Sequence, residues 1–226
     1  MTTIADNLQR VQARISAACQ ACARPVDAVT LMAVSKTFGA EAVRQAYAAG
    51  QRVFGENYIQ EAVDKITALA DLPLQWHCIG PIQSNKTRLV ATHFDWVHSV
   101  DRLKIAQRLS EQRPADKPPL QVCIQVNIDG GSTKAGVQPE AALELAQQIQ
   151  ALPRLQLRGL MTIPEPAADF AAACAVHTQA RRLLEALNAK GLGLDTLSMG
   201  MSADLDAAVQ CGSTMVRVGS AIFGKR

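Results

Sequence analysis

A lysine stands at the end of the first strongly apolar segment of the chain. Residues 29–39 read VTLMAVSKTFG, so Lys36 follows a run typical of a buried strand and precedes a helical pattern. A primary amine in this position could form a Schiff base with a carbonyl compound. Alternation along the strand puts Lys36 on the face of Met32 and Val34, so we expect it to be desolvated and to point into the fold. A lysine that reaches solvent from the rim is the alternative.

Two glycine-containing segments near the C-terminal end could hold a phosphate group. Residues 197–202 read LSMGMS and lead into a helical pattern, and residues 215–224 read MVRVGSAIFG, with Gly219 and Ser220 ending an apolar run. Small residues at the start of a helix expose backbone N–H groups, and the helix dipole favours an anion there. Together with the lysine, these segments predict a ligand that carries both a carbonyl and a phosphate.

Arg217 lies between Val216 and Val218 in the last apolar run. A charge in such a run needs a partner, because an unpaired buried charge is costly. A structural ion pair is one interpretation. A pyridine nitrogen is the other, because a guanidinium that always stays charged discourages protonation of that nitrogen. Pyridoxal phosphate combines an aldehyde, a ring nitrogen and a phosphate, so it is the ligand that these residues favour.

Eight strand-like runs alternate with helical patterns along the chain. Several are apolar at nearly every position, as expected of parallel strands that are buried on both faces. Short connections between strand and helix predict a (β/α)8 TIM barrel, a single domain over residues 1–226. An open doubly wound sheet is the alternative. The runs lie near residues 29–35, 52–56, 75–80, 95–100, 120–127, 156–163, 195–199 and 215–220.

The ends of the predicted helices can be placed by residue type. Gly50, Gly191 and Gly212 fall just past helical runs, where a left-handed residue is favoured, and Asp101 and Ser202 stand at N-cap positions. One further helix, within residues 1–20, precedes the first strand and could cover the seam between strands eight and one, and none follows the last strand. Function in such a barrel collects at the C-terminal ends of the strands, and the loops after strands seven and eight are its usual phosphate site.

Composition narrows the class of protein. The net charge of +3 is spread along 226 residues without a run of Lys or Arg, which gives no support for nucleic-acid binding. The chain shows neither a secretory signal nor an apolar stretch long enough to span a membrane, so we expect a cytoplasmic protein. Its six cysteines are expected to be free thiols, and Cys19 and Cys22 lack the further ligands that a zinc site needs.

Over essentially its whole length the chain resembles the pyridoxal phosphate homeostasis proteins, the YggS/PROSC family. The most specific match is WHCIGPIQSNK at residues 76–86. The other matching segments are Ala33–Lys36, Phe54–Tyr58, Gly159–Met161, Ser198–Ser202 and Val216–Gly224. The barrel with its lysine also resembles the N-terminal domain of alanine racemase.

The resemblance implies that pyridoxal phosphate is held on Lys36 as an internal aldimine. It further implies that Arg217 faces the ring nitrogen, and that Lys134, near the mouth of the barrel, accepts or relays the cofactor. Ser132 replaces a commonly acidic residue near that lysine. His77 is expected to pack or hydrogen-bond beneath the mouth, with direct cofactor contact as the alternative. The phosphate is assigned to Ser202, Gly219 and Ser220, and the remaining cofactor residues are Asn57, Met161, Ser198, Gly200 and Met201.

The family resemblance implies a carrier that buffers and delivers pyridoxal phosphate, affects amino-acid and keto-acid balance and has no established reaction. We expect it to be a monomer, with apo-enzymes as its protein partners. A weak amino-acid racemase is one alternative. Because the second base of alanine racemase is a tyrosine from an adjoining domain, and the sequence ends at Arg226, we expect weak racemase activity at most. A Schiff-base aldolase acting on a sugar phosphate is another, for which Glu56 and Asp195 are the candidate bases. A scaffold without ligand leaves Lys36 unexplained.

Overall fold

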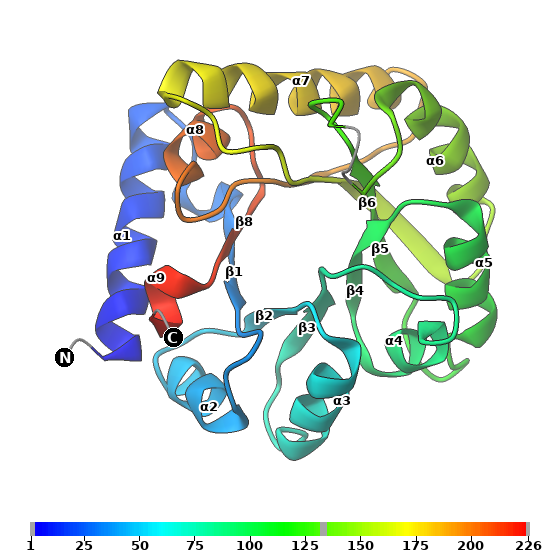
Figure 1. Ribbon diagram of the computed structural model, residues 1–226, viewed down its shortest axis with the longest axis horizontal. Coiled ribbons are helices and arrows are strands. Elements are labelled where there is room, and N and C mark those ends of the chain that lie inside the picture. The colour runs from blue at the N-terminus through cyan, green and yellow to red at the C-terminus, as the bar shows by residue number, and fades with distance from the viewer. Residues whose placement is uncertain (1–2, 132–134, 225–226) are drawn as a thin grey trace.

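Eight parallel strands form a closed barrel in the protein. The structure, a computed structural model, describes residues 3–131 and 135–224. Each strand pairs with the next along the chain, and β8 pairs with β1, so the ring in Figure 1 has no free edge. This closure confirms the predicted (β/α)8 barrel over the open sheet. The strands are β1 Thr30–Val34, β2 Val53–Glu56, β3 Gln75–Cys78, β4 Trp96–Val100, β5 Leu120–Val126, β6 Leu155–Thr162, β7 Thr196–Ser198 and β8 Met215–Val218.

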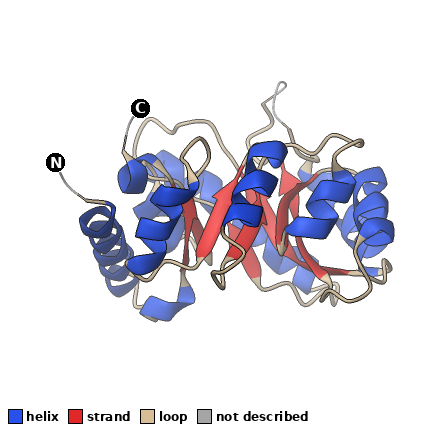
Figure 2. Ribbon diagram, turned by 90° about the horizontal axis from the view of Figure 1, so that it is seen from below, coloured by secondary structure: helices blue, strands red, loops and turns tan. Residues whose placement is uncertain are grey.

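Helices surround the strands on the outside (Figure 2). They are α1 Ile4–Ala21, α2 Ala40–Ala48, α3 Ile59–Ala68, α4 Thr87–His93, α5 Leu103–Gln112, α6 Ala142–Gln150, α7 Phe170–Asn188, α8 Leu205–Gln210 and α9 Ser220–Phe223, with short 3-10 turns at Val26–Ala28 and Pro139–Ala141. Helix α1 packs against α2, α8 and α9, so it covers the seam between β8 and β1 as predicted. No helix in the described part of the chain has the length and hydropathy to cross a bilayer.

Three local predictions at the helix ends need correction. A one-turn helix, α9, does follow the last strand, and its four residues are too few to show helical periodicity in the sequence. The N-cap position of α5 is Arg102, and Asp101, one residue earlier, forms an ion pair with that arginine. Helix α8 begins after Asp204, beyond Ser202. The three glycines predicted to end helices do have positive φ angles, 98° at Gly50, 86° at Gly191 and 100° at Gly212.

The strands separate two buried regions. Side chains on their outer face pack against the helices in one continuous apolar core, which includes Leu31, Phe54, Val97, Val122, Leu160 and Val216. Alternate residues fill the barrel interior, which is more polar. There, Trp96, Cys123 and Met161 form a small cluster, and the Trp96 ring stacks on His77 with centroids 5.2 Å apart. The interior therefore combines apolar packing with buried polar groups that need partners.

Two buried histidines of the interior hydrogen-bond to each other. His77 Nδ1 lies 2.8 Å from His98 Nε2, and His77 Nε2 lies 3.0 Å from Gln75 Oε1. An amide oxygen can only accept, so His77 Nε2 carries the proton and His77 Nδ1 accepts from His98. Burial lowers the pKa of His77 to about 3. Burial, together with His77 and the positive charge of Arg217, also lowers the pKa of His98 well below its ordinary value.

We expect the free energy of unfolding to fall as the pH drops below about 6.5, where an unfolded histidine takes up a proton. In the folded barrel both rings stay neutral in this range, His77 down to about pH 3. Acid therefore favours the unfolded chain, whose histidines take up protons that the folded rings do not. Two such histidines give a slope of up to about 2.7 kcal/mol per pH unit. Denaturant titrations between pH 5 and about 6.5 measure it. The variant His98→Gln, which keeps a donor for His77, should lose about half of the slope; an unchanged slope would contradict this account.

Candidate functional site

Lys36 lies in the turn that follows β1, at the C-terminal end of the barrel. It is exposed, so the expectation of a desolvated lysine is wrong. The physical reason is that β1 ends at Val34, and the strand alternation used for the prediction does not extend to the turn. The next residue, Thr37, has a φ angle of 71°, which is uncommon for a β-branched residue. Lys36 is therefore an exposed residue at the C-terminal end of the barrel, which is the mouth.

The strands on either side of β1 bring two further predicted residues beside this turn. Strand β2 pairs with β1 and leads into Asn57, and β8 pairs with β1 and leads into Gly219. The Oδ1 atom of Asn57 is buried and has no hydrogen-bond partner among the described residues. A side chain at position 219 would place its Cβ 3.1 Å from the Val34 carbonyl oxygen, so glycine allows the ends of β1 and β8 to lie close together.

The loop after β7 carries the second predicted glycine segment. Gly200 has a φ of 93°, and a Cβ there would lie 2.4 Å from the Cβ of Ala208, so only glycine fits. Met201 is 40 % exposed, and Ser202 is half-buried. The Gly200 carbonyl accepts a hydrogen bond from the backbone N–H of Arg217, 3.0 Å away, which joins this loop to β8. The two glycine segments therefore meet at one side of the mouth.

Arg217 points its guanidinium across the barrel interior. Nη1 donates to the carbonyl and the hydroxyl of Ser198, at 2.7 and 2.8 Å, and Nη2 donates to the carbonyl of Thr162 at 2.8 Å. All three acceptors are neutral, so the ion pair considered from the sequence is not formed among the described residues. Burial lowers the pKa of Arg217 to about 10, and the more distant charge of Asp204 opposes this shift. The guanidinium therefore stays charged at neutral pH with no carboxylate bound to it in the described part of the chain.

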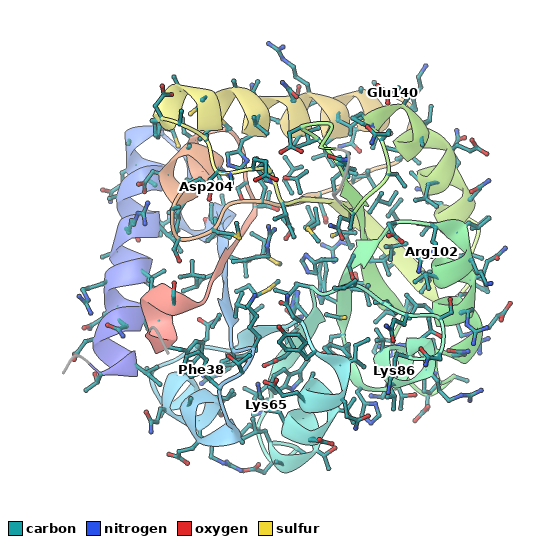
Figure 3. The ribbon with its side chains drawn as sticks, viewed as in Figure 1. Phe38, Lys65, Lys86, Arg102, Glu140 and Asp204 are labelled. Carbon is teal, nitrogen blue, oxygen red and sulfur yellow. The ribbon has the colours of Figure 1, made fainter. Side chains whose placement is uncertain are left out.

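Contacts that the sequence did not reveal hold the glycine segments in place. Arg14 of α1 donates to the Ser202 carbonyl at 2.7 Å and forms an ion pair with Asp206 at 2.8 Å. Asp204, labelled in Figure 3, accepts a hydrogen bond from the Met201 N–H at 2.7 Å. Its other carboxylate oxygen lies 2.9 Å from His177 Nε2. The alternating pattern of α1 marks it as amphipathic, but no signal in the sequence relates its arginine to a loop nearly 200 residues away.

Other predicted residues lie deeper or are engaged elsewhere. His77 and Met161 are fully buried in the interior, and both His77 nitrogens are bonded to protein atoms, so cofactor contact through a ring nitrogen would require one of these bonds to break. Ser198 is buried and bound to Arg217, whereas Ser220 is exposed at the start of α9. Lys134 and Ser132 lie outside the described residues. Among residues 3–131 and 135–224, no three side chains of His, Cys, Asp or Glu are grouped to hold a metal.

Each candidate base of the aldolase alternative is paired with a basic side chain, although Glu56 Oε2 has no hydrogen-bond partner among the described residues. Glu56 is fully buried, and its Oε1 accepts from the Ser35 hydroxyl and from Lys65 Nζ, each at 2.6 Å. Burial raises the pKa of Glu56, although Lys65 opposes the shift. Asp195 precedes β7, at the end of the barrel opposite the mouth, and forms an ion pair with Arg158 at 2.6 Å. Neither carboxylate is free at the mouth of the barrel.

Comparison with known proteins places the whole chain in one family. Residues 6–226 match the family described as alanine racemase, N-terminal domain. The pyridoxal phosphate homeostasis protein of Pseudomonas aeruginosa is 62 % identical over 226 residues, which cover 100 % of this chain and 97 % of the relative. The protein of the same name from Escherichia coli K12 is 52 % identical over 229 residues, covering 100 % and 98 %.

Solved structures agree with this assignment. PipY of Synechococcus elongatus, solved with pyridoxal phosphate bound, is 39 % identical with a TM-score of 0.85, covering 98 % of this chain and 100 % of PipY. An alanine racemase of Clostridium difficile gives a TM-score of 0.76 at 16 % identity, covering 98 % of this chain and 57 % of the racemase, which shows a shared fold. The chain therefore belongs to the alanine racemase N-terminal domain family and, within it, to the pyridoxal phosphate homeostasis proteins.

Proposed function

We propose that this chain binds pyridoxal phosphate reversibly on Lys36 and buffers and delivers it. The observation that carries the proposal is the position of Lys36, an exposed amine in the turn between the ends of β2 and β8, beside the two glycine segments. PipY, which is 39 % identical over nearly all of the chain, has been solved with this cofactor bound. We further propose that residues 1–226 act as one monomeric, cytoplasmic cofactor-binding domain, that apo-enzymes receive the cofactor, and that Lys134 relays it.

The residues at the mouth fit the chemical groups of the cofactor. Lys36 supplies an amine for the aldehyde. Gly219, Ser220 and Ser202 supply backbone and hydroxyl donors for the phosphate, on the two segments that meet beside β1. The buried and unpartnered Oδ1 of Asn57 offers an acceptor to a ligand hydroxyl. The lining of the cofactor site and its supports are completed by Ser198, Gly200, Met201, Met161 and His77.

The surroundings of Arg217 favour a carrier over a racemase. When bound, pyridoxal phosphate supplies an aldehyde that condenses reversibly with an amine, and a ring that can withdraw electrons. The charged guanidinium, which no described carboxylate neutralises, discourages protonation of a ring nitrogen beside it and so weakens that withdrawal. Lys36, being exposed, is accessible to other amines that could take over the aldehyde. Holding and releasing the cofactor thus needs no second base of the kind that racemisation requires.

The first test compares the parent protein with Lys36→Ala after incubation with pyridoxal phosphate. Once unbound cofactor has been removed by gel filtration, we expect a near-visible absorption band in the parent, because the imine formed on an amine of the protein absorbs there, and no band in the variant. Lys190→Ala is the matched control, since Lys190 is an exposed lysine just beyond α7. It should keep the band. A parent that stays colourless after incubation would refute the proposed function, and racemase assays on the same samples would reveal any residual activity.

A second test concerns the arginine that supports the Ser202 loop. Arg14→Met removes the 2.7 Å hydrogen bond to the Ser202 carbonyl and a half-exposed ion pair. We expect the affinity for pyridoxal phosphate to fall about three- to tenfold, because the loop loses its contact with α1, with a loss of about 1 kcal/mol in unfolding free energy. Titration followed by the absorption band measures the affinity. Arg182→Met, which changes an exposed arginine of α7, should bind like the parent; equal affinity in all three proteins would argue against the support.

A further inference from the structure

A second lysine, Lys65, is directed from α3 at the turn that carries Lys36. It is 5 % exposed and lies on the α2–α3 side of the barrel, as its label in Figure 3 shows. Its Nζ donates to Glu56 Oε1 at 2.6 Å, to the Ser35 carbonyl at 2.9 Å and to Glu61 Oε1 at 3.3 Å. An ammonium group has three donors, so these contacts account for all of them. Lys65 is therefore fully engaged by protein atoms.

The same acidic partners hold both residues that flank Lys36. Glu56 Oε1 accepts from the Ser35 hydroxyl at 2.6 Å, and Lys65 bonds the Ser35 carbonyl. On the other side, Glu61 Oε1 accepts from the Thr37 backbone N–H at 2.6 Å. We call Lys65, Glu56 and Glu61 the clamp. Through Ser35 and Thr37, the clamp fixes the backbone immediately before and after Lys36 without contact to the Lys36 amine.

The conformation of Thr37 shows why such a clamp is needed. A φ of 71° is unfavourable for a β-branched residue, and residues in such regions persist only when their surroundings hold them there. The hydrogen bond from the Thr37 N–H to Glu61 supplies that restraint. Released from it, the turn would be free to relax toward commoner backbone angles, which would move the base of the Lys36 side chain.

Stability alone gives a weak reason for burying Lys65 and Glu56. Their side chains are 4 % and 0 % exposed, and a buried ion pair is often no more stabilising than apolar residues of similar size. Burial raises the pKa of Glu56 even with Lys65 beside it, so desolvation of the carboxylate is substantial. What an apolar pair could not do is bond the Ser35 hydroxyl and carbonyl. Their hydrogen bonds to Ser35 thus account for the presence of charged groups at this position.

We propose that Lys65 is a positioning residue for Lys36: the clamp holds the turn so that the Lys36 amine is placed for capture of an aldehyde. The inference rests on the proposed function, because it assigns to Lys65 a part in the same site. The proposed role of the clamp distinguishes ligands that react with the Lys36 amine from ligands that do not. Capture through the amine depends on the clamp, whereas binding through phosphate and ring alone depends on the glycine segments and Arg217, which the clamp does not contact.

The experiment compares Lys65→Met with the parent for two ligands. Pyridoxal phosphate carries the aldehyde, and pyridoxine 5′-phosphate is its alcohol analogue, with the same ring and phosphate but no group that condenses with an amine. We expect the variant to bind pyridoxal phosphate at least about tenfold more weakly, with the near-visible band forming more slowly, and to bind the analogue within about twofold of the parent. Absorbance follows the first ligand and calorimetry the second. Equal weakening of both ligands, or of neither, would overturn the proposal.

Matched variants keep the test decisive if Lys65→Met folds poorly. Glu61 is 37 % exposed, so Glu61→Ala removes the acceptor of the Thr37 N–H with little change to the core, and Glu61→Gln keeps an acceptor in place. We expect about threefold selective loss of aldehyde capture in Glu61→Ala and recovery in Glu61→Gln; parent-like capture in Glu61→Ala would refute the clamp. Arg44→Met is the control. Arg44 lies on the neighbouring helix α2 and forms a bidentate surface pair with Asp71, which the variant breaks, so it should bind both ligands normally.

The outcomes separate this inference from the function on which it rests. A parent protein that forms no band with pyridoxal phosphate refutes the proposed function itself. A parent that forms the band, while Lys65→Met and Glu61→Ala capture the aldehyde as well as the parent does, refutes only the role of the clamp.

Discussion

The pairing of β8 with β1 is the constraint on which the site depends. Four register pairs join these strands, including Met32 with Arg217 and Ala33 with Val218. Because parallel strands end at the same edge, this pairing puts the turn after β1 beside the glycine segment after β8, although they are about as distant in sequence as the barrel allows. Gly219 lets the two strand ends approach, and Gly200 connects the loop after β7 to the same place. The same strand pairing thus closes the barrel and assembles the mouth.

Polar groups inside the barrel are arranged by hydrogen bonds to neutral partners. The guanidinium of Arg217 is bound by carbonyl and hydroxyl oxygens, and burial keeps the two interior histidines neutral while they hydrogen-bond to each other. The ionic contacts instead lie behind the strands and around the rim, in the clamp and in the pair of Arg14 with Asp206. Arg217 therefore keeps its positive charge beneath the mouth, whereas the ion pairs support the loops of the mouth from outside the barrel.

The architecture was readable from the sequence because buried parallel strands are apolar at successive positions and alternate with helical patterns. Lys36 and the glycine segments were found for the same reason: they interrupt those patterns at strand ends. The exposure of Lys36 was predicted wrongly, because alternation holds only within a strand. The clamp was missed, since the spacing of Glu61 and Lys65 is that of an ordinary helical ion pair, and nothing local relates it to Ser35. Contacts of high sequence separation were the part that a single sequence did not reveal.

Helix α1 fills the last place in the outer ring, next to the segments that end the barrel. Its Asn7 bonds the carbonyl of Ile222, 215 residues later, and Arg14 bonds Ser202, 188 residues later. During synthesis the apolar face of this helix, with Leu8, Val11 and Ile15, is made long before α8 and α9, which cover part of it. Such non-local contacts slow folding and lengthen the time for which apolar surface stays uncovered. Part of the apolar face of α1 therefore stays uncovered until β8 and the helices on either side of it have formed.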